Sequence, residues 1–226
     1  MRGCFVTATG TDVGKTVFAR ALTHALLASG RTVAALKPIE TGYESELGSD
    51  AASLAAAAGC AALAHAPGFY RAAAPLAPAA VALAGGPPVP TPAKLSEAVR
   101  AAARGYQVAV VEGAGGLLVP MDATHTVADL ALALGLPLVM VAPDGLGVLS
   151  HVLTAVESAT ARGLRLRAVV LMTQPASSVD PSSQSNAQLL ESRVGCAVHR
   201  FGRAPLDPEG LRRFAEGLSW LPGLGD

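Results

Sequence analysis

The stretch from residue 4 to residue 27 constrains the fold more than any other part of the chain. Residues 5–7 are aromatic or β-branched, which favours a short strand. Small residues follow, then Gly14-Lys15-Thr16 and an amphipathic run at 17–27 that is typical of a helix. A strand, a loop of small residues, Gly-Lys-Thr and a helix, in this order, predict a phosphate-binding loop.

The residues of this loop suit the binding of a polyphosphate. Backbone N–H groups can surround phosphates where side chains are small, and the helix N-terminus adds the positive end of its dipole. Lys15 would supply a fixed positive charge, and the Thr16 hydroxyl could ligate Mg²⁺. The spacing departs from the usual pattern, because Thr9 stands where a glycine is usual and Gly10 lies one position later. The prediction therefore rests on the position of the motif between a strand and a helix.

Two further predicted strands end in residues suited to the same ligand. The strand at 32–36 is followed by KPIETG, which begins with Lys37, and the strand at 107–111 is followed by Glu112 and a glycine-rich turn. The apolar runs are continuous rather than alternating, which indicates an α/β fold with a mostly parallel sheet and helices on both faces. Such sheets bind ligands at the carboxyl ends of their strands, so we expect Lys15, Lys37 and Glu112 at one site.

The remainder of the chain continues the alternation of helices and strands. We expect a helix at 50–58 with Ser49 as its N-cap, a poorly regular segment at 61–92 with one short helix near 78–83, and a polar, mobile segment at 173–186. The other expected helices lie at 94–104, 148–161, 187–194 and 209–217, and a capping box at 126–129 begins one more. The other expected strands lie at 138–141, 168–172 and 198–201. The length fits a single domain over residues 1–226.

Composition argues against several classes of partner. Lys and Arg total 17 and Asp and Glu total 17, so the formal net charge is zero and nothing predicts a nucleic-acid or membrane-surface partner. The three cysteines, Cys4, Cys60 and Cys196, are widely spaced, which predicts reduced thiols in a cytoplasmic protein. We expect no signal peptide before the first strand and no apolar run long enough to span a membrane.

Five segments, in this order and spacing, resemble one known family: FVTATGTDVGKT, KPIETG, SDAA, VVEGAGGLLVP and LGVLSH. The family is dethiobiotin synthetase. The resemblance covers nearly the whole chain, is weakest after about Met172, and is most specific at KPIETG and EGAGGLLVP. It implies a P-loop NTPase-like fold and a ligase that converts 7,8-diaminopelargonic acid (7,8-diaminononanoate), CO₂ and ATP into dethiobiotin, ADP and phosphate.

The resemblance also implies a chemical route and a set of partners. One substrate amine traps CO₂ as a carbamate, a carbamate oxygen attacks the γ-phosphate to give a carbamic-phosphoric anhydride, and the second amine closes the cyclic urea. Mg²⁺ is the implied cofactor and ATP the co-substrate. The implied assembly is a cytoplasmic homodimer with active sites at the subunit interface, without nucleic-acid or membrane partners.

Residue roles follow from the same resemblance, position by position. The implied catalytic residues are Lys37, Lys15 and Thr11, and the implied metal ligands are Thr16, Asp50 and Glu112. The implied nucleotide-binding residues are Asp12, Val13, Gly14, Lys15, Thr16, Val17, Asp50, Glu112, Gly113, Ala114, Gly115, Met172, Thr173, Pro205 and Leu206. The implied substrate-binding residues are Thr41, Gly147, Val148, Leu149 and Ser150, the last four being a helix start that receives the substrate carboxylate from the partner subunit.

Three positions depart from the family pattern. Ala8 replaces the first loop glycine, Ser150 replaces a common Asn, and Met172 stands where an Asn usually reads the adenine edge. A thioether cannot donate and accept hydrogen bonds as an amide does. We therefore hypothesise that the protein discriminates weakly between nucleotide bases.

The residues alone leave other interpretations open. Asp50 taken locally is a first-turn carboxylate that favours the helix dipole. A related phosphate-loop amidoligase is one alternative, although this chain shows no Cys-His arrangement to supply ammonia. A partitioning or positioning ATPase is another, although such proteins carry an extra lysine early in the loop, where this chain has Thr9–Thr11.

Overall fold

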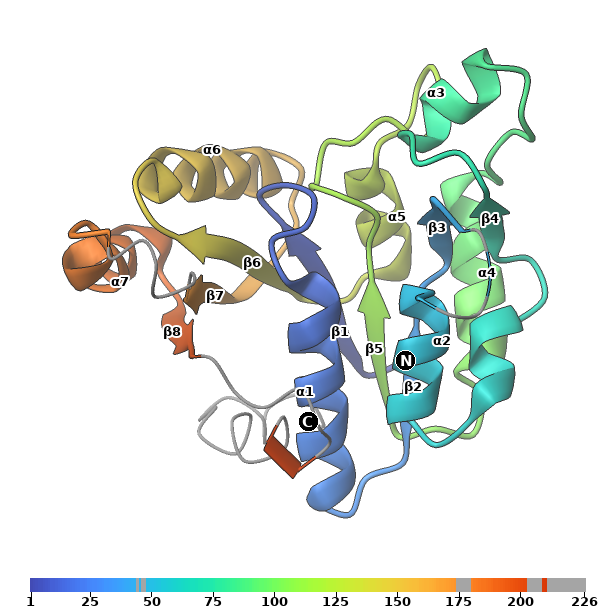
Figure 1. Cartoon of the computed structure of the whole chain (residues 1–226), viewed down its shortest axis with the longest axis horizontal. Helices are drawn as coiled ribbons and strands as arrows, with labels where there is room; N and C mark the ends of the chain where they lie inside the picture. The colour runs from blue at the N-terminus through green and yellow to red at the C-terminus, as the bar shows by residue number, and fades with distance from the viewer. Residues whose placement is uncertain (44, 46–47, 174–179, 203–208, 211–226) are drawn as a thin grey trace.

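The computed structural model of the chain describes residues 1–43, 45, 48–173, 180–202 and 209–210 (Figure 1). Its main sheet has six strands in the order β2-β5-β1-β6-β7-β8, and every pairing is parallel. These strands are β1 (Gly3–Ala8), β2 (Val33–Leu36), β5 (Val108–Glu112), β6 (Leu138–Asp144), β7 (Leu166–Thr173) and β8 (Ala197–Phe201). The predicted α/β class and parallel sheet are confirmed.

Helices cover both faces of this sheet, as predicted. The helices are α1 (Lys15–Ala28), α2 (Asp50–Ala57), α3 (Pro78–Leu83), α4 (Pro92–Ala102), α5 (Val127–Leu134), α6 (Val148–Ala161) and α7 (Ser183–Val194). Helix α1 packs Phe18 against Cys4 and Val6, whereas α4 and α5 share a hydrophobic cluster with Phe5 from the opposite face of β1. Helices α6 and α7 pack on the same side as α5, against Met140 and its neighbours in β6 and β7.

A second, two-stranded parallel sheet was not predicted. Strand β3 (Ile39–Thr41) pairs with β4 (Tyr70–Ala72), and the 3₁₀-helix η1 (Ala61–His65) precedes β4. Strands of three residues are too short to show a hydrophobic period, which is why residues 61–92 read as poorly regular with one helix. That one helix is α3, at the expected residues.

The ranges predicted for β6 and α7 were both too short. Strand β6 runs three residues beyond 138–141 to Asp144, and α7 begins at Ser183 instead of residue 187. The two extended ends are in contact, because the Asn186 Nδ2 donates to Asp144 Oδ1 at 2.9 Å and ties the first turn of α7 to the end of β6. Thr173, expected to start a mobile segment, is the last residue of β7.

Two predicted helix starts are confirmed. Ser49 caps α2, its Oγ accepting from Ala52 N at 3.1 Å, and Thr126 with Asp129 forms the capping box of α5. All three cysteines are free. Among the described residues, no helix is long and apolar enough to cross a membrane. The predicted helix at 209–217 lies outside the described residues except for its first two.

Candidate active site

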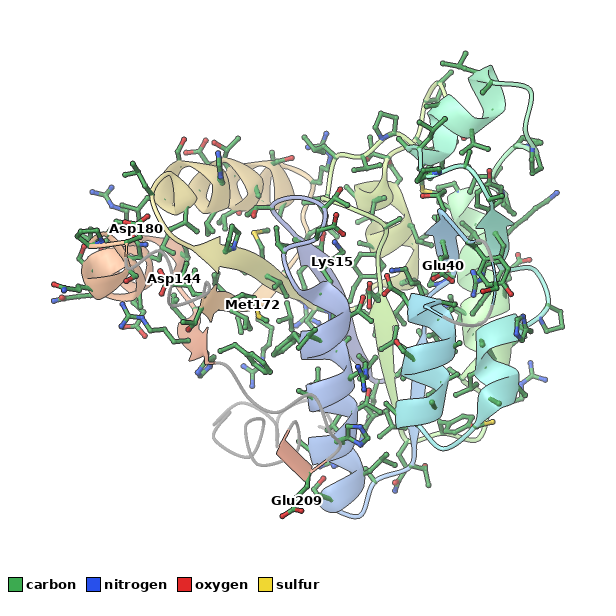
Figure 2. All side chains as sticks on the ribbon, in the orientation of Figure 1. Lys15, Glu40, Asp144, Met172, Asp180 and Glu209 are labelled. Atoms are coloured by element: carbon green, nitrogen blue, oxygen red, sulfur yellow. The ribbon has the colours of Figure 1, made fainter. Side chains whose placement is uncertain are left out.

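The loop between β1 and α1 has the geometry of an anion-binding turn. Gly14 is the N-cap of α1 with φ of +99°, and Asp12 has φ of +56°. This positive φ at Gly14 is a backbone conformation that favours glycine, and a Cβ there would lie 2.7 Å from the flexible end of the Met172 side chain. Thr9 N donates to Val141 O at 3.0 Å and anchors the loop to β6. Lys15 Nζ donates to Gly10 O at 3.1 Å, which holds its ammonium over the loop (Figure 2).

Beside this loop, four elements contribute one cluster of charged and hydroxyl groups. Lys37 follows β2, Glu112 ends β5, Asp50 begins α2 and Thr16 lies in the first turn of α1. Lys37 Nζ donates to Glu112 Oε1 at 2.7 Å and also contacts Asp50 Oδ2. Thr16 Oγ1 donates to the same Glu112 oxygen at 2.9 Å. The strand ends that the sequence placed at one site do therefore meet.

Burial and neighbouring charges shift the pKa values of Lys15, Lys37 and Glu112, and their relative weight differs from one residue to the next. Desolvation lowers the pKa of Lys15. Desolvation also acts to lower the pKa of Lys37, but the charges of Glu112 and Asp50 outweigh it and raise that pKa. Desolvation raises the pKa of the fully buried Glu112, the Asp50 charge adds to the rise, and the Lys37 charge opposes it. Lys37 and Glu112 thus both hold their protons more tightly than in water, Lys37 because of charge and Glu112 because of burial.

A cavity of about 350 Å³ joins the loop to the cluster. It is lined by Thr11, Asp12, Gly14, Lys15, Thr16, Val17, Lys37, Ile39, Glu40, Thr41, Asp50, Glu112, Ala114 and Gly115. Every catalytic and metal-binding residue predicted from the sequence lies in this lining, together with most of the predicted nucleotide-binding residues and Thr41.

Other predicted residues lie outside the lining. Gly113 is a packing position, because a Cβ there would lie 2.9 Å from the Phe5 ring. Met172, at the end of β7, packs against Gly14 on the side of the loop away from Glu40 (Figure 2). The other residues outside the lining are Val13, Thr173, Gly147, Val148, Leu149 and Ser150; the last three belong to the first turn of α6 and Gly147 is its N-cap. Pro205 and Leu206 lie outside the described residues.

Sequence reasoning missed two residues of the lining, Ile39 and Glu40. Both belong to β3, the short strand that was not predicted. The available signal was the position of a carboxylate within KPIETG, three residues after Lys37. The partners of Glu40 lie in α2 and β4, and no local pattern shows that these elements meet.

The oxygen atoms of the cluster fit a hard divalent cation. Glu112 is fully buried, and its Oε2 has no hydrogen-bond partner among the described residues. The Asp50 carboxylate is about half exposed toward the cavity, and Thr16 adds a hydroxyl. No group of three or more His, Cys, Asp or Glu side chains within the described part of the chain could hold a metal by itself. Two carboxylates and a hydroxyl match Mg²⁺, which takes few protein ligands and completes its shell with phosphate and water.

The parallel sheet, with this loop at the carboxyl ends of its strands, defines a P-loop NTPase-like protein. Solved structures share the fold: chloroplast FtsY from Physcomitrella patens (TM-score 0.55, 15% identity, covering 95% of this chain and 66% of that chain) and MinD, a cell division ATPase from Pyrococcus furiosus (TM-score 0.53, 17% identity, 98% and 92%). A ParA family ATPase from Chlorobium tepidum TLS is similar as well (TM-score 0.52, 14% identity, 98% and 94%). At these identities the likeness concerns the fold.

Similarity in sequence identifies the family, which the likeness in fold does not. A family model described as AAA domain matches residues 2–209. The ATP-dependent dethiobiotin synthetase BioD of Anaeromyxobacter dehalogenans (strain 2CP-C) is 44% identical over 216 residues, 94% of each chain. The enzyme of the same name from Saccharopolyspora erythraea is 42% identical over 193 residues, 85% of this chain and 83% of that one. The chain belongs to the dethiobiotin synthetase family and is a ligase, as the resemblance implied.

Proposed function

We propose that the protein makes dethiobiotin, ADP and phosphate from 7,8-diaminopelargonic acid, CO₂ and ATP, with Mg²⁺. The observation that carries this proposal is the position of Lys37, whose ammonium contacts Glu112 and Asp50 in the cavity that also holds the phosphate-binding loop. The names of the relatives support the same activity. A single domain over residues 1–226, acting in the cytoplasm, is part of the proposal.

The loop and its neighbours would bind the triphosphate. Lys15 and the backbone N–H groups at the start of α1 would hold the β- and γ-phosphates, because phosphoryl transfer depends mainly on position and on neutralised charge. Thr16, Asp50 and Glu112 would hold Mg²⁺, which when bound supplies positive charge to the phosphate oxygens. The unpartnered Glu112 oxygen supports this assignment.

Lys37 would act on the reacting atoms. The substrate amine adds to CO₂ and loses a proton to give a carbamate, whose negative charge the Lys37 ammonium stabilises. A carbamate oxygen then attacks the γ-phosphorus and ADP leaves. The second amine attacks the carbamoyl carbon, phosphate leaves, and the cyclic urea forms. Thr11 and Thr41, both in the lining, would orient the diamine.

A homodimer would complete the site. Gly147, Val148, Leu149 and Ser150, proposed to receive the substrate carboxylate, lie at the start of α6 and not in the lining of this chain's cavity. Leu146, directly before them, is 87% exposed. We propose that this helix start serves the cavity of a second copy.

The nucleotide base would lie toward Met172. This side chain packs against Gly14, and the thioether offers no amide-like pair of donor and acceptor. We therefore propose relaxed selectivity among nucleoside triphosphates.

Formation of the product tests the proposed function. The protein is incubated with ATP, Mg²⁺, labelled bicarbonate and the diamine, and labelled dethiobiotin is detected by mass spectrometry. We expect label in dethiobiotin only when all components are present, and loss of the signal when EDTA removes the metal. Hydrolysis of ATP without any labelled product would contradict the proposal.

A further inference from the structure

Glu40 is a buried carboxylate that turns toward the start of α2. Its Oε1 accepts from Asp50 N at 2.7 Å and from Ala51 N at 3.4 Å. The Ser49 hydroxyl lies within hydrogen-bond distance of both of its oxygens, at 3.2 and 3.0 Å. Arg71 Nε lies 3.4 Å from Oε2. Although Glu40 lines the cavity, both of its oxygens are therefore already occupied by protein groups.

These contacts satisfy backbone N–H groups at the start of α2. The first N–H groups of a helix have no partner within it, and a carboxylate there interacts favourably with the helix dipole. The Ser49 hydroxyl satisfies Ala52 N, and Glu40 satisfies the two preceding N–H groups from a different strand. The start of α2 is thus fixed to β3 as well as capped locally.

The residue fixed in this way is also the one that faces Lys37. Glu40 holds the backbone N–H of Asp50, and the Asp50 carboxylate contacts the Lys37 ammonium. We propose that Glu40 is a positioning residue, which sets the position of the Asp50 carboxylate in the cavity and so the affinity of the site for a divalent cation. The inference rests on the proposed function for the assignment of Asp50 as a metal ligand.

The small sheet gives this residue its support. Glu40 and Arg71 are register partners in the β3–β4 pair, which places the guanidinium beside the carboxylate. Arg71 also donates to Ala64 O at 2.7 Å and to Tyr70 O at 2.8 Å, so its position is fixed from η1 and from β4. Arg71 belongs to the segment 61–92, which was predicted to be poorly regular. This segment thus positions the Glu40 carboxylate, which in turn accepts from Asp50 N.

The test replaces Glu40 with Gln, which keeps the size and changes one acceptor oxygen into a donor. Asp129→Asn is the matched control, because Asp129 Oδ2 accepts from Thr126 N at 2.6 Å at the start of α5, outside the cavity lining. Asp50→Asn removes the proposed carboxylate ligand itself and gives the loss of cation affinity with which the Glu40 variant is compared. Mn²⁺ binding to the full chain with ADP is measured by electron paramagnetic resonance, and the Mg²⁺ concentration for half-maximal turnover is measured in parallel.

We expect Glu40→Gln to weaken Mn²⁺ binding about tenfold, the lower range for residues that orient metal ligands. The Mg²⁺ concentration for half-maximal turnover should rise by the same factor, while kcat at saturating Mg²⁺ and KM for the diamine stay near the wild-type values. A merely structural role would instead lower the active fraction equally at every Mg²⁺ concentration. Glu40→Asp, which keeps the charge beside Arg71 but cannot reach Asp50 N, should change the affinity in the same direction if Glu40→Gln does not fold.

Unchanged Mn²⁺ affinity in a folded Glu40 variant would overturn the inference. An equal loss in Asp129→Asn would do so too, as would Mn²⁺ binding that Asp50→Asn leaves intact. Failure of the proposed function would show separately, as absence of dethiobiotin from the wild-type protein, because Mn²⁺ binding needs no turnover.

Discussion

Lys37 lies with its ammonium between two carboxylates of very different exposure. Glu112 is completely buried, whereas the Asp50 side chain is 45% exposed. A buried carboxylate needs a compensating positive charge, and in this arrangement Lys37 provides it. A divalent cation bound by the same two carboxylates would compete with the ammonium for their negative charge, so the metal affinity and the position of Lys37 should be linked.

Lys37→Met tests this link at the residue scale. The methionine keeps an unbranched side chain and removes the charge, so we expect the nucleotide-free protein to bind Mn²⁺ more tightly than the wild type. Turnover should fall by about a hundredfold or more, as when one electrostatic group of a transition state is removed. Lys15→Met is the comparison: its ammonium donates to Gly10 O and interacts with the charges of Glu112 and Asp50 without donating to them, so its loss should tighten Mn²⁺ binding less. Mn²⁺ affinity that Lys37→Met leaves unchanged would contradict the competition.

The side chain at position 172 should determine the selectivity among nucleotide bases. We expect the wild-type kcat/KM for ATP to exceed that for GTP or CTP by less than about a hundredfold, roughly 2.7 kcal/mol. Met172→Asn should raise the preference for ATP because an amide can donate to the base and accept from it. Met172→Leu, which conserves volume and adds no polar group, should leave the ratio unchanged. A wild-type preference above a hundredfold would refute relaxed selectivity.

At the scale of elements, the loop before α1 depends on the end of β7. The Gly14 backbone has a positive φ, and Met172 fills the space beside its Cα. The turn from which helix α1 begins at Lys15 therefore favours glycine at position 14 because of its positive φ.

Gly14→Ala should abolish nucleotide binding and lower the free energy of unfolding by about 1–3 kcal/mol, because alanine is strained at a φ of +99°. Gly10→Ala is the matched control in the same loop: its φ is unstrained, and a Cβ there would meet no atom closer than Val13 Cγ1 at 3.8 Å. Binding of a fluorescent ATP analogue and urea unfolding check both variants. Equal effects of the two substitutions would rule out the role given to Gly14.

Most elements could be predicted because their patterns are long. Continuous apolar runs marked β1, β5 and β6, and the capping residues marked α2 and α5. Strands β3 and β4 are defined only by their pairing with each other, which no three-residue pattern reveals. The role of Glu40 was missed for the same reason, since its partners come from α2 and β4. Lys15, Lys37 and Glu112 could be predicted because each follows, or ends, a recognisable strand.

At the scale of the whole molecule, the parallel sheet brings the residues of the candidate site together. The same sheet contains the most buried of the three cysteine thiols. Cys4 in β1 is fully buried between β1, α1 and the neighbouring strands, and burial raises the pKa of its thiol to about 12. The folded protein therefore keeps this proton at pH values where the unfolded chain, with a pKa near 9.0, has lost it. Stability from this group falls as pH rises from 9 toward 12.

The free energy of unfolding should show this dependence. Between pH 9 and pH 10 the wild-type protein should lose about 1 kcal/mol more than Cys4→Ala, because one unit of pKa difference corresponds to 1.36 kcal/mol. The smaller alanine side chain adds a loss of stability that is the same at each pH and cancels in the comparison. Urea unfolding of both proteins at pH 7, 9 and 10 gives the values. Parallel stability curves for the two proteins would contradict the prediction.

Phosphate release from ATP is the measurement that tests the central claim most directly. Release is followed with Mg²⁺ and bicarbonate, with and without the diamine, for the wild type and for Lys37→Ala. We predict strong dependence on the diamine in the wild type and loss of that dependence in the variant, because we propose that Lys37 stabilises the carbamate and the transferred phosphoryl group. Release that is indifferent to the diamine and to the substitution would contradict the assignment and would fit a nucleotide-switched ATPase on the same fold.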